Sequence, residues 1–107
     1  MSKTIRFQVA LAAVILLAGA VSFAQSGEAT YKTKCASCHG SAGVPSPGIA
    51  KAMGVKPAND PSVKSKTEAQ MVAATTNGVA PHMPAFKGKL SDAEIKASVD
   101  FFRTFSK

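Results

Sequence analysis

Apolar positions recur with the period of an α-helix in three segments of the chain. The first predicted helix covers residues 27–38, where Tyr31, Cys35 and Cys38 lie at i, i+4 and i+7 and so share one face. The two cysteines are therefore expected to point toward the interior. No segment alternates apolar and polar residues over a useful length, so the pattern predicts an all-α fold.

The second predicted helix runs from Thr67 to Asn77. The stretch "SKTE" at residues 65–68 has the spacing of a capping box, and Gly78 stands where a helix commonly ends on a glycine. The apolar strip along this helix is weak.

The third predicted helix begins at "SDAE", residues 91–94, which is a second capping box, and continues nearly to the end of the chain. Ile95, Val99 and Phe102 lie at i, i+4 and i+7 and form its apolar face. Two further phenylalanines widen this face, so we expect it to carry much of the core.

Two turn-rich segments separate the helices. They are "GSAGVPSPG" at 40–48 and "GVKPANDPS" at 54–62, and neither is expected to contain a long regular element. The chain has one tyrosine and no tryptophan, and a domain of this size buries little of its surface. We therefore predict three main helices whose loops wrap a bound group that helps to fill the centre.

The start of the chain has the order of a secretory signal peptide. Two basic residues occur within the first six positions, residues 9–21 are apolar apart from one glycine, and "SFA" follows at 22–24. The apolar run of 13 residues is short beside the roughly 20 that span a membrane. We predict cleavage after Ala24, with residues 25–107 as the exported domain; an uncleaved membrane anchor is the alternative.

The central motif is "CASCH" at residues 35–39. Two cysteines separated by two residues and followed at once by a histidine are typical of c-type haem attachment. The thiols of Cys35 and Cys38 add across the two vinyl groups, and His39 offers its imidazole to the iron. Export is consistent with such attachment.

Thiol redox chemistry and zinc binding fit this motif less well than haem attachment does. A redox dithiol normally opens a helix in a βαβ setting, whereas these cysteines lie at the end of a predicted helix. A structural zinc site needs four ligands, and His82 is the one remaining Cys or His. An exported disulfide beside an incidental histidine is the plain structural alternative.

A low-spin electron-transfer haem usually has a second axial ligand, commonly a methionine sulfur. Met83 is flanked by prolines in an expected loop, so helical packing does not explain it. Met53 and Met71 fall within helical patterns and are interpreted as core fillers. The adjacent His82 is the other candidate for this position.

These residues resemble a known family, the small class I c-type cytochromes of bacterial periplasms, of the cytochrome c6, c5 and c553 kind. The resemblance covers Gly27 through Lys107, and its strongest elements are "CASCHG" at 35–40 and "MPAF" at 83–86. In that family the first and last helices cross closely. The resemblance implies that Gly27 and Tyr31 lie against the aromatic pair of "VDFFR" at 99–103, Phe101 and Phe102.

The resemblance also implies the ligand set of one covalent haem c. Cys35 and Cys38 would form the thioether bonds, His39 the proximal iron bond and Met83 the distal one. The family orients the proximal imidazole by a hydrogen bond to a proline carbonyl in the following loop. The candidates here are Pro45 and Pro47, of which Pro47 is preferred.

Iron with six ligands leaves no place for a substrate, so we expect a periplasmic electron carrier, monomeric by default at this size, rather than an enzyme. The chain has a net charge of +7, two units of which belong to the predicted leader. Lys87 and Lys89 follow the distal ligand and are expected to meet an acidic patch on redox partner proteins, unless they merely keep the protein soluble. No nucleic-acid motif occurs, and no stable membrane association is expected after cleavage. A gas sensor or peroxidase with a labile sixth ligand, or an exported thiol-disulfide oxidoreductase, are the alternatives.

Overall fold

The computed structural model describes residues 27–107, and the predicted signal peptide lies outside the described residues. Residues 27–34 are helical. The elements that follow are α2 (Ala36–His39), α3 (Pro47–Met53), α4 (Pro61–Lys64), α5 (Glu68–Asn77), α6 (Asp92–Arg103) and the 3-10 helix η1 (Thr104–Ser106). Within residues 27–107, the β-structure is limited to two isolated bridges, as the predicted all-α fold requires. None of the helices in this described part is long and apolar enough to cross a membrane.

The first predicted helix is present with one local interruption. Residues 27–34 form its main part, Cys35 adopts a turn, and α2 continues it through His39. The Cys35 amide donates to the Tyr31 carbonyl at 2.9 Å, so the helical bonding carries across the turn. Gly40 then ends α2 with φ 85°, a backbone conformation that favours glycine.

Each of the two predicted loops contains the start of a short helix that the hydrophobic pattern does not show. Ser46 caps α3, and Pro47 is its first residue. In the same way Asp60 caps α4, whose first residue is Pro61. Proline costs little at this position because its missing amide would have no partner inside the helix. The Ser-Pro and Asp-Pro pairs are therefore the sequence signal for α3 and α4.

The start of α5 differs in detail from the prediction. The capping box is formed by Thr67 and Gln70, with the Gln70 amide donating to Thr67 Oγ1 at 3.1 Å and the Thr67 amide donating to Gln70 Oε1 at 2.9 Å. The box predicted at residues 65–68 is wrong, because Ser65 closes α4 and donates its amide to the Pro61 carbonyl. The second predicted box is confirmed, since Ser91 and Glu94 cap α6 reciprocally.

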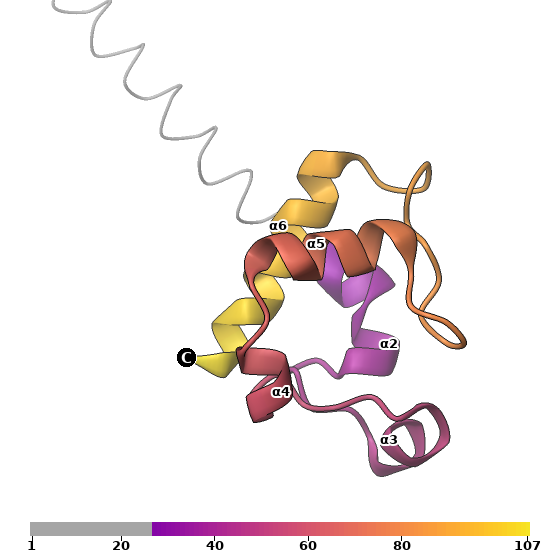
Figure 1. The fold of residues 1–107 in the computed structure, drawn as a ribbon, viewed down its shortest axis with the longest axis vertical. Helices are drawn as coiled ribbons and strands as arrows, with labels where there is room; N and C mark the ends of the chain where they lie inside the picture. Colours follow the sequence, from indigo (N-terminus) through magenta and orange to yellow (C-terminus); the bar gives the residue numbers. More distant parts are fainter. Residues whose placement is uncertain (1–26) are drawn as a thin grey trace, which may run out of the picture.

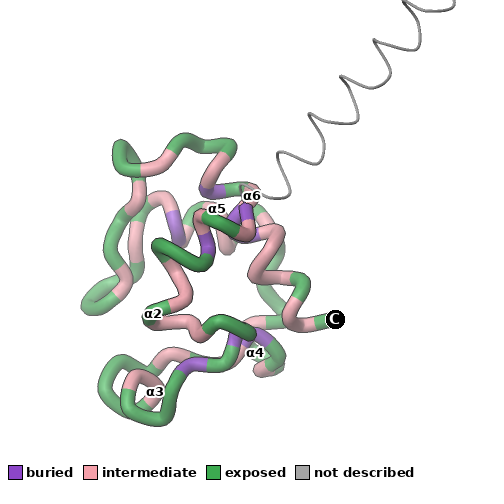
Figure 2. The backbone as a smooth tube through the Cα atoms, turned by 180° about the vertical axis from the view of Figure 1, so that it is seen from behind, coloured by how far each residue is buried: buried purple, intermediate pink, exposed green. Residues whose placement is uncertain are grey.

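The core lies where the first helix meets α6, and α5 also packs on α6 (Figure 1). Its buried apolar side chains are Tyr31, Ala58, Ile95 and Val99. Figure 2 shows buried positions along α6, whereas α3 contains none. The predicted apolar face of the last helix is thus the face that packs inward.

Tyr31 lies among three phenylalanines of the C-terminal segment. Its ring centroid is 5.3 Å from that of Phe101, 6.1 Å from that of Phe102 and 5.5 Å from that of Phe105. Gly27 lies against the Ala97 backbone instead, where an added Cβ would be 2.6 Å from the Ala97 oxygen. The expected crossing of the first and last helices is present, with Tyr31 on the aromatic pair and Gly27 about one turn nearer the start of α6.

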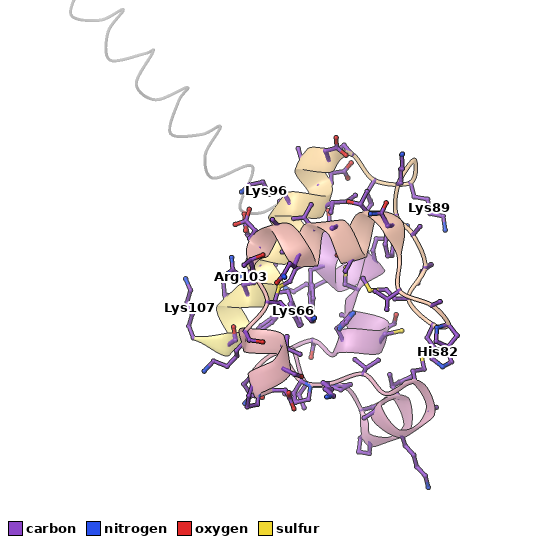
Figure 3. All side chains as sticks on the ribbon, in the orientation of Figure 1. Lys66, His82, Lys89, Lys96, Arg103 and Lys107 are labelled. Atoms are coloured by element: carbon purple, nitrogen blue, oxygen red, sulfur yellow. The ribbon has the colours of Figure 1, made fainter. Side chains whose placement is uncertain are left out.

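A surface ion-pair network connects α5 with α6. Lys96 Nζ lies 3.2 Å from Glu68 Oε1 and 2.9 Å from Asp100 Oδ2, and Arg103 lies 3.6 Å from Glu68 Oε2 (Figure 3). Such exposed pairs contribute about 0–1 kcal/mol each. The network therefore adds a little stability to the packing of α5 on α6, but it is not the main reason that the two helices pack.

Candidate functional site

Cys35, Cys38 and His39 are brought together on a single turn of chain. The amides of Cys38 and His39 both donate to the Cys35 carbonyl, at 3.2 and 3.0 Å. All three residues are half-buried, and both cysteines are free thiols. Because residues three and four positions apart share a helix face, the turn presents the two thiols to the same side.

Burial changes the ionisation of this turn. It raises the pKa of the Cys35 thiol and lowers the pKa of the His39 imidazole. A thiol with a raised pKa is the opposite of the activated thiolate that a thiol-disulfide enzyme uses. A neutral imidazole is the form that binds a metal. The raised pKa of Cys35 thus gives no support to dithiol redox chemistry.

The hydrogen bond expected between His39 and a proline is not formed. His39 Nδ1 is buried and has no hydrogen-bond partner, so neither Pro45 nor Pro47 accepts from it. Pro47 is the first residue of α3, which directs its carbonyl along that helix. The preference for Pro47 is therefore wrong, and Pro45, although buried, does not replace it.

Two contacts hold the residues around His39. Phe102 presents its ring to the imidazole with a centroid distance of 5.4 Å and an interplanar angle of 65°. The Tyr31 hydroxyl donates to the Gly40 carbonyl at 2.6 Å, directly after His39. Burial, with a smaller effect of Cys35, raises the pKa of Tyr31 to about 12. Neither contact can be predicted from the sequence. Phe102 is far from His39 along the chain, and Tyr31 and Gly40 are brought together by the turn at Cys35.

Met83 lies in a short closed loop after α5. Its amide donates to the Val79 carbonyl and its carbonyl accepts from the Val79 amide, both at 2.9 Å. Gly78, which ends α5 with φ 78°, lies beneath this loop; an added Cβ would be 2.8 Å from the Met83 oxygen and from the Ala85 nitrogen. The glycine predicted to end the helix thus also makes room for the backbone of Met83.

The far side of the Met83 loop is tied back to α5. The Phe86 amide donates to the Thr75 carbonyl at 3.0 Å, and the Lys87 amide donates to the Thr76 carbonyl at 3.1 Å. In Figure 1 the loop descends from the end of α5 toward the level of α2 and α3. Its position is therefore fixed at both ends by backbone hydrogen bonds.

The side chains of this loop differ in exposure. Met83 is half-buried, whereas His82 is exposed and lies at the edge of the molecule (Figure 3). Met53, interpreted as a core filler, is instead exposed at the end of α3, and Met71 is half-buried in α5. In the described part of the chain, His, Cys, Asp and Glu form no group of three or more that could hold a metal.

Comparison with known proteins gives the family. The family described as cytochrome C oxidase, cbb3-type, subunit III matches residues 22–102. The chain belongs to this c-type cytochrome family. A solved structure, the KustC0563 c-type cytochrome, is similar with 28% identity and a TM-score of 0.68, covering 76% of this chain and 98% of that one. No curated protein matches.

The family confirms the predicted small class I c-type cytochrome and its all-α cytochrome fold, and it implies that the chain binds haem c. The residues of the cytochrome fit such a group. The thiols are free, burial lowers the pKa of the His39 imidazole, and its buried Nδ1 has no hydrogen-bond partner. The buried apolar core of residues 27–107 consists of four side chains. A domain of this size needs more buried apolar area than that, which a porphyrin supplies.

Proposed function

We propose that this cytochrome is an exported electron-transfer protein of the periplasm. Cys35 and Cys38 would hold one haem c by thioether bonds, with His39 and Met83 as the axial ligands. The bound haem supplies one-electron exchange between ferric and ferrous iron. The protein's part is to hold two neutral ligands in place and to exclude a substrate from the iron.

The observation that carries this proposal is the double fixation of the Met83 loop. Hydrogen bonds to Val79 on one side and to the last turn of α5 on the other hold a half-buried methionine on a non-helical segment. A side chain that served only as core would need no such support. A ligand that stays bound in both oxidation states does need it, because little reorganisation at the iron makes electron exchange fast.

The test is an absorption spectrum of the haem-loaded protein, oxidised and reduced, with and without carbon monoxide. We expect a low-spin c-type spectrum, a ferric band from methionine-to-iron charge transfer, and no response to carbon monoxide. Met83→Ala should abolish the band and admit carbon monoxide, whereas Met53→Ala, at an exposed methionine, should leave both unchanged.

Different spectra would assign a different function. Carbon monoxide binding to the unsubstituted protein would contradict the carrier and indicate a sensor or peroxidase. A spectrum without covalent haem would return the cysteines to dithiol chemistry. Retention of the band in Met83→Ala would remove Met83 from the ligand set.

The partners are proposed to be redox proteins with an acidic docking surface. Lys87 and Lys89 are exposed beyond the Met83 loop, and none of the ion pairs in the described residues involves them. The pairs instead occupy the first helix, α5 and α6. Unneutralised charges near the redox site steer weak encounters and lose their effect as salt screens them.

A further inference from the structure

Tyr31 stands where three segments meet: the first helix, the end of α6, and the turn that follows His39. It is 1% exposed, its ring lies among the phenylalanines of the last helix, and its hydroxyl reaches the Gly40 carbonyl at 2.6 Å. A phenylalanine would serve the packing equally well. The hydroxyl therefore needs a reason of its own, because a buried polar group lowers stability unless it is bonded.

The hydroxyl holds the carbonyl of Gly40, the residue that follows His39. The Gly40 amide donates to the Ala36 carbonyl at 2.8 Å, and its carbonyl accepts from both the Tyr31 hydroxyl at 2.6 Å and the Gly43 amide at 3.2 Å. A side chain at Gly40 would meet the Val44 backbone. The two peptide groups on either side of the Gly40 Cα, directly after the histidine, are thus both held by hydrogen bonds.

The ring of Tyr31 is also connected to His39, through packing on Phe102. It stacks on Phe102 with an interplanar angle of 27° and a centroid distance of 6.1 Å, and Phe102 in turn contacts the His39 imidazole. A ligating histidine usually has its ring plane fixed by a hydrogen bond from its other nitrogen. His39 Nδ1 has no hydrogen-bond partner in the structure, and Phe102 is the aromatic ring that lies against the imidazole.

We propose that Tyr31 is a positioning residue for His39: its hydroxyl fixes the backbone after the histidine, and its ring, through Phe102, fixes the imidazole plane. This inference rests on the proposed function, in which His39 binds the haem iron. It adds to the packing of the first and last helices a specific effect on the iron ligand. The orientation of an axial ligand is one of the factors by which a protein tunes its metal.

The test uses Tyr31→Phe in the haem-loaded cytochrome, which keeps the ring and removes only the hydroxyl. We expect a changed pattern of hyperfine-shifted proton resonances in the ferric protein and a reduction potential shifted from that of the unsubstituted protein. The methionine-to-iron band should persist. The matched control is Thr33→Val, which removes an exposed hydroxyl that donates within the same helix, to the Ala29 carbonyl, and should change neither quantity.

An unchanged resonance pattern and potential in Tyr31→Phe, with only a lower melting temperature, would overturn the inference and leave Tyr31 a purely structural residue. If Tyr31→Phe yields no haem-loaded protein, Phe101→Leu decides, because Phe101 packs on the Tyr31 ring and no aromatic contact joins it to His39: an altered resonance pattern supports the inference and an unaltered one overturns it. Failure of the proposed function is recognised separately, since the unsubstituted protein would then lack covalent haem or the methionine band.

Discussion

At the scale of single residues, Tyr31 shows how a buried hydroxyl couples stability to pH. Its pKa is raised to about 12, whereas an unfolded chain would ionise it near pH 10. The folded state thus retains a proton that the unfolded state loses. The stabilisation is complete below about pH 10 and declines as the pH rises toward 12.

We predict that the free energy of unfolding falls by on the order of 2 kcal/mol between pH 10 and pH 12 through this group alone. Denaturant titrations of the haem-loaded protein and of Tyr31→Phe across this range would measure it. The lysines titrate in both proteins, so the difference between the two curves isolates Tyr31. Parallel curves would show that the hydroxyl ionises equally in both states.

At this scale the sequence predicts chemistry better than it predicts contacts. The spacing of Cys35, Cys38 and His39 follows from one helical turn, and the structure places all three there. The sequence does not show that the hydrogen bond from His39 to a proline carbonyl is missing, because the direction of a carbonyl depends on whether its residue starts a helix. Pro47 does start one, and the helical pattern that includes Met53 does not show at which residue α3 begins.

At the scale of elements, two glycines control how segments approach each other. Gly27 is the point where the first helix touches the α6 backbone. We predict that Gly27→Ala destabilises the cytochrome by about 1–3 kcal/mol, the usual effect of overpacking, although alanine is by itself the better helix former. Thermal or denaturant unfolding measures the effect.

Gly48→Ala is the control for this substitution, because an added Cβ there meets nothing within 4 Å and α3 is a helix. Its stability should be unchanged or slightly higher. If both variants gain stability, the close approach of the first helix to α6 has room for a methyl group, and the prediction is wrong.

Gly78 has a different effect, on the Met83 loop rather than on a helix crossing. An added Cβ would meet the Met83 oxygen and the Ala85 nitrogen, so we predict that Gly78→Ala displaces the loop, weakens the ferric methionine band and admits carbon monoxide. Gly88→Ala has a similar positive φ, 80°, but meets nothing within 4 Å. Gly88→Ala therefore introduces the same backbone strain as Gly78→Ala without the contact to the Met83 loop. If the ferric methionine band weakens in both variants, the cause is backbone strain and not that contact.

The elements themselves are predictable where apolar periodicity and capping coincide, as in α6. Periodicity does not show where helices as short as α3 and α4 begin, and their starts are recognisable by a capping residue followed by proline. The capping box predicted at residues 65–68 is wrong because two capping boxes are possible here. Ser65 stands three residues before Glu68, and Thr67 stands three residues before Gln70. Ser65 is the residue that ends α4, so Thr67 is the residue that caps the start of α5.

At the scale of the whole molecule, charge is unevenly distributed. Glu68, Lys96, Asp100 and Arg103 neutralise one another across α5 and α6, while lysines elsewhere remain exposed. We predict that reversing Lys87 and Lys89 to glutamate lowers the rate of electron transfer to an acidic redox protein and flattens its dependence on salt. Stopped-flow measurements over a range of ionic strength would show this.

The control changes Lys64 and Lys66 to glutamate, which alters the net charge equally at the other end of α5. Lys66 precedes the first residue of α5, and Lys87 is bonded to its last turn, so about 15 Å of helix separates the two pairs. An equal effect of both double variants would mean that net charge, and not a docking surface near Met83, governs the encounter.

The meeting of the two ends of the described chain determines when this domain can form. Tyr31 and its partners on α6 and η1 are roughly 70 residues apart along the chain, so their contact is of high sequence separation. A growing polypeptide offers the Tyr31 ring none of these aromatic partners until the end of α6 and η1 have been synthesised. The native core therefore closes only after α6 has been made, and a premature stop codon that removes this helix should leave a product that is open to proteases throughout its length.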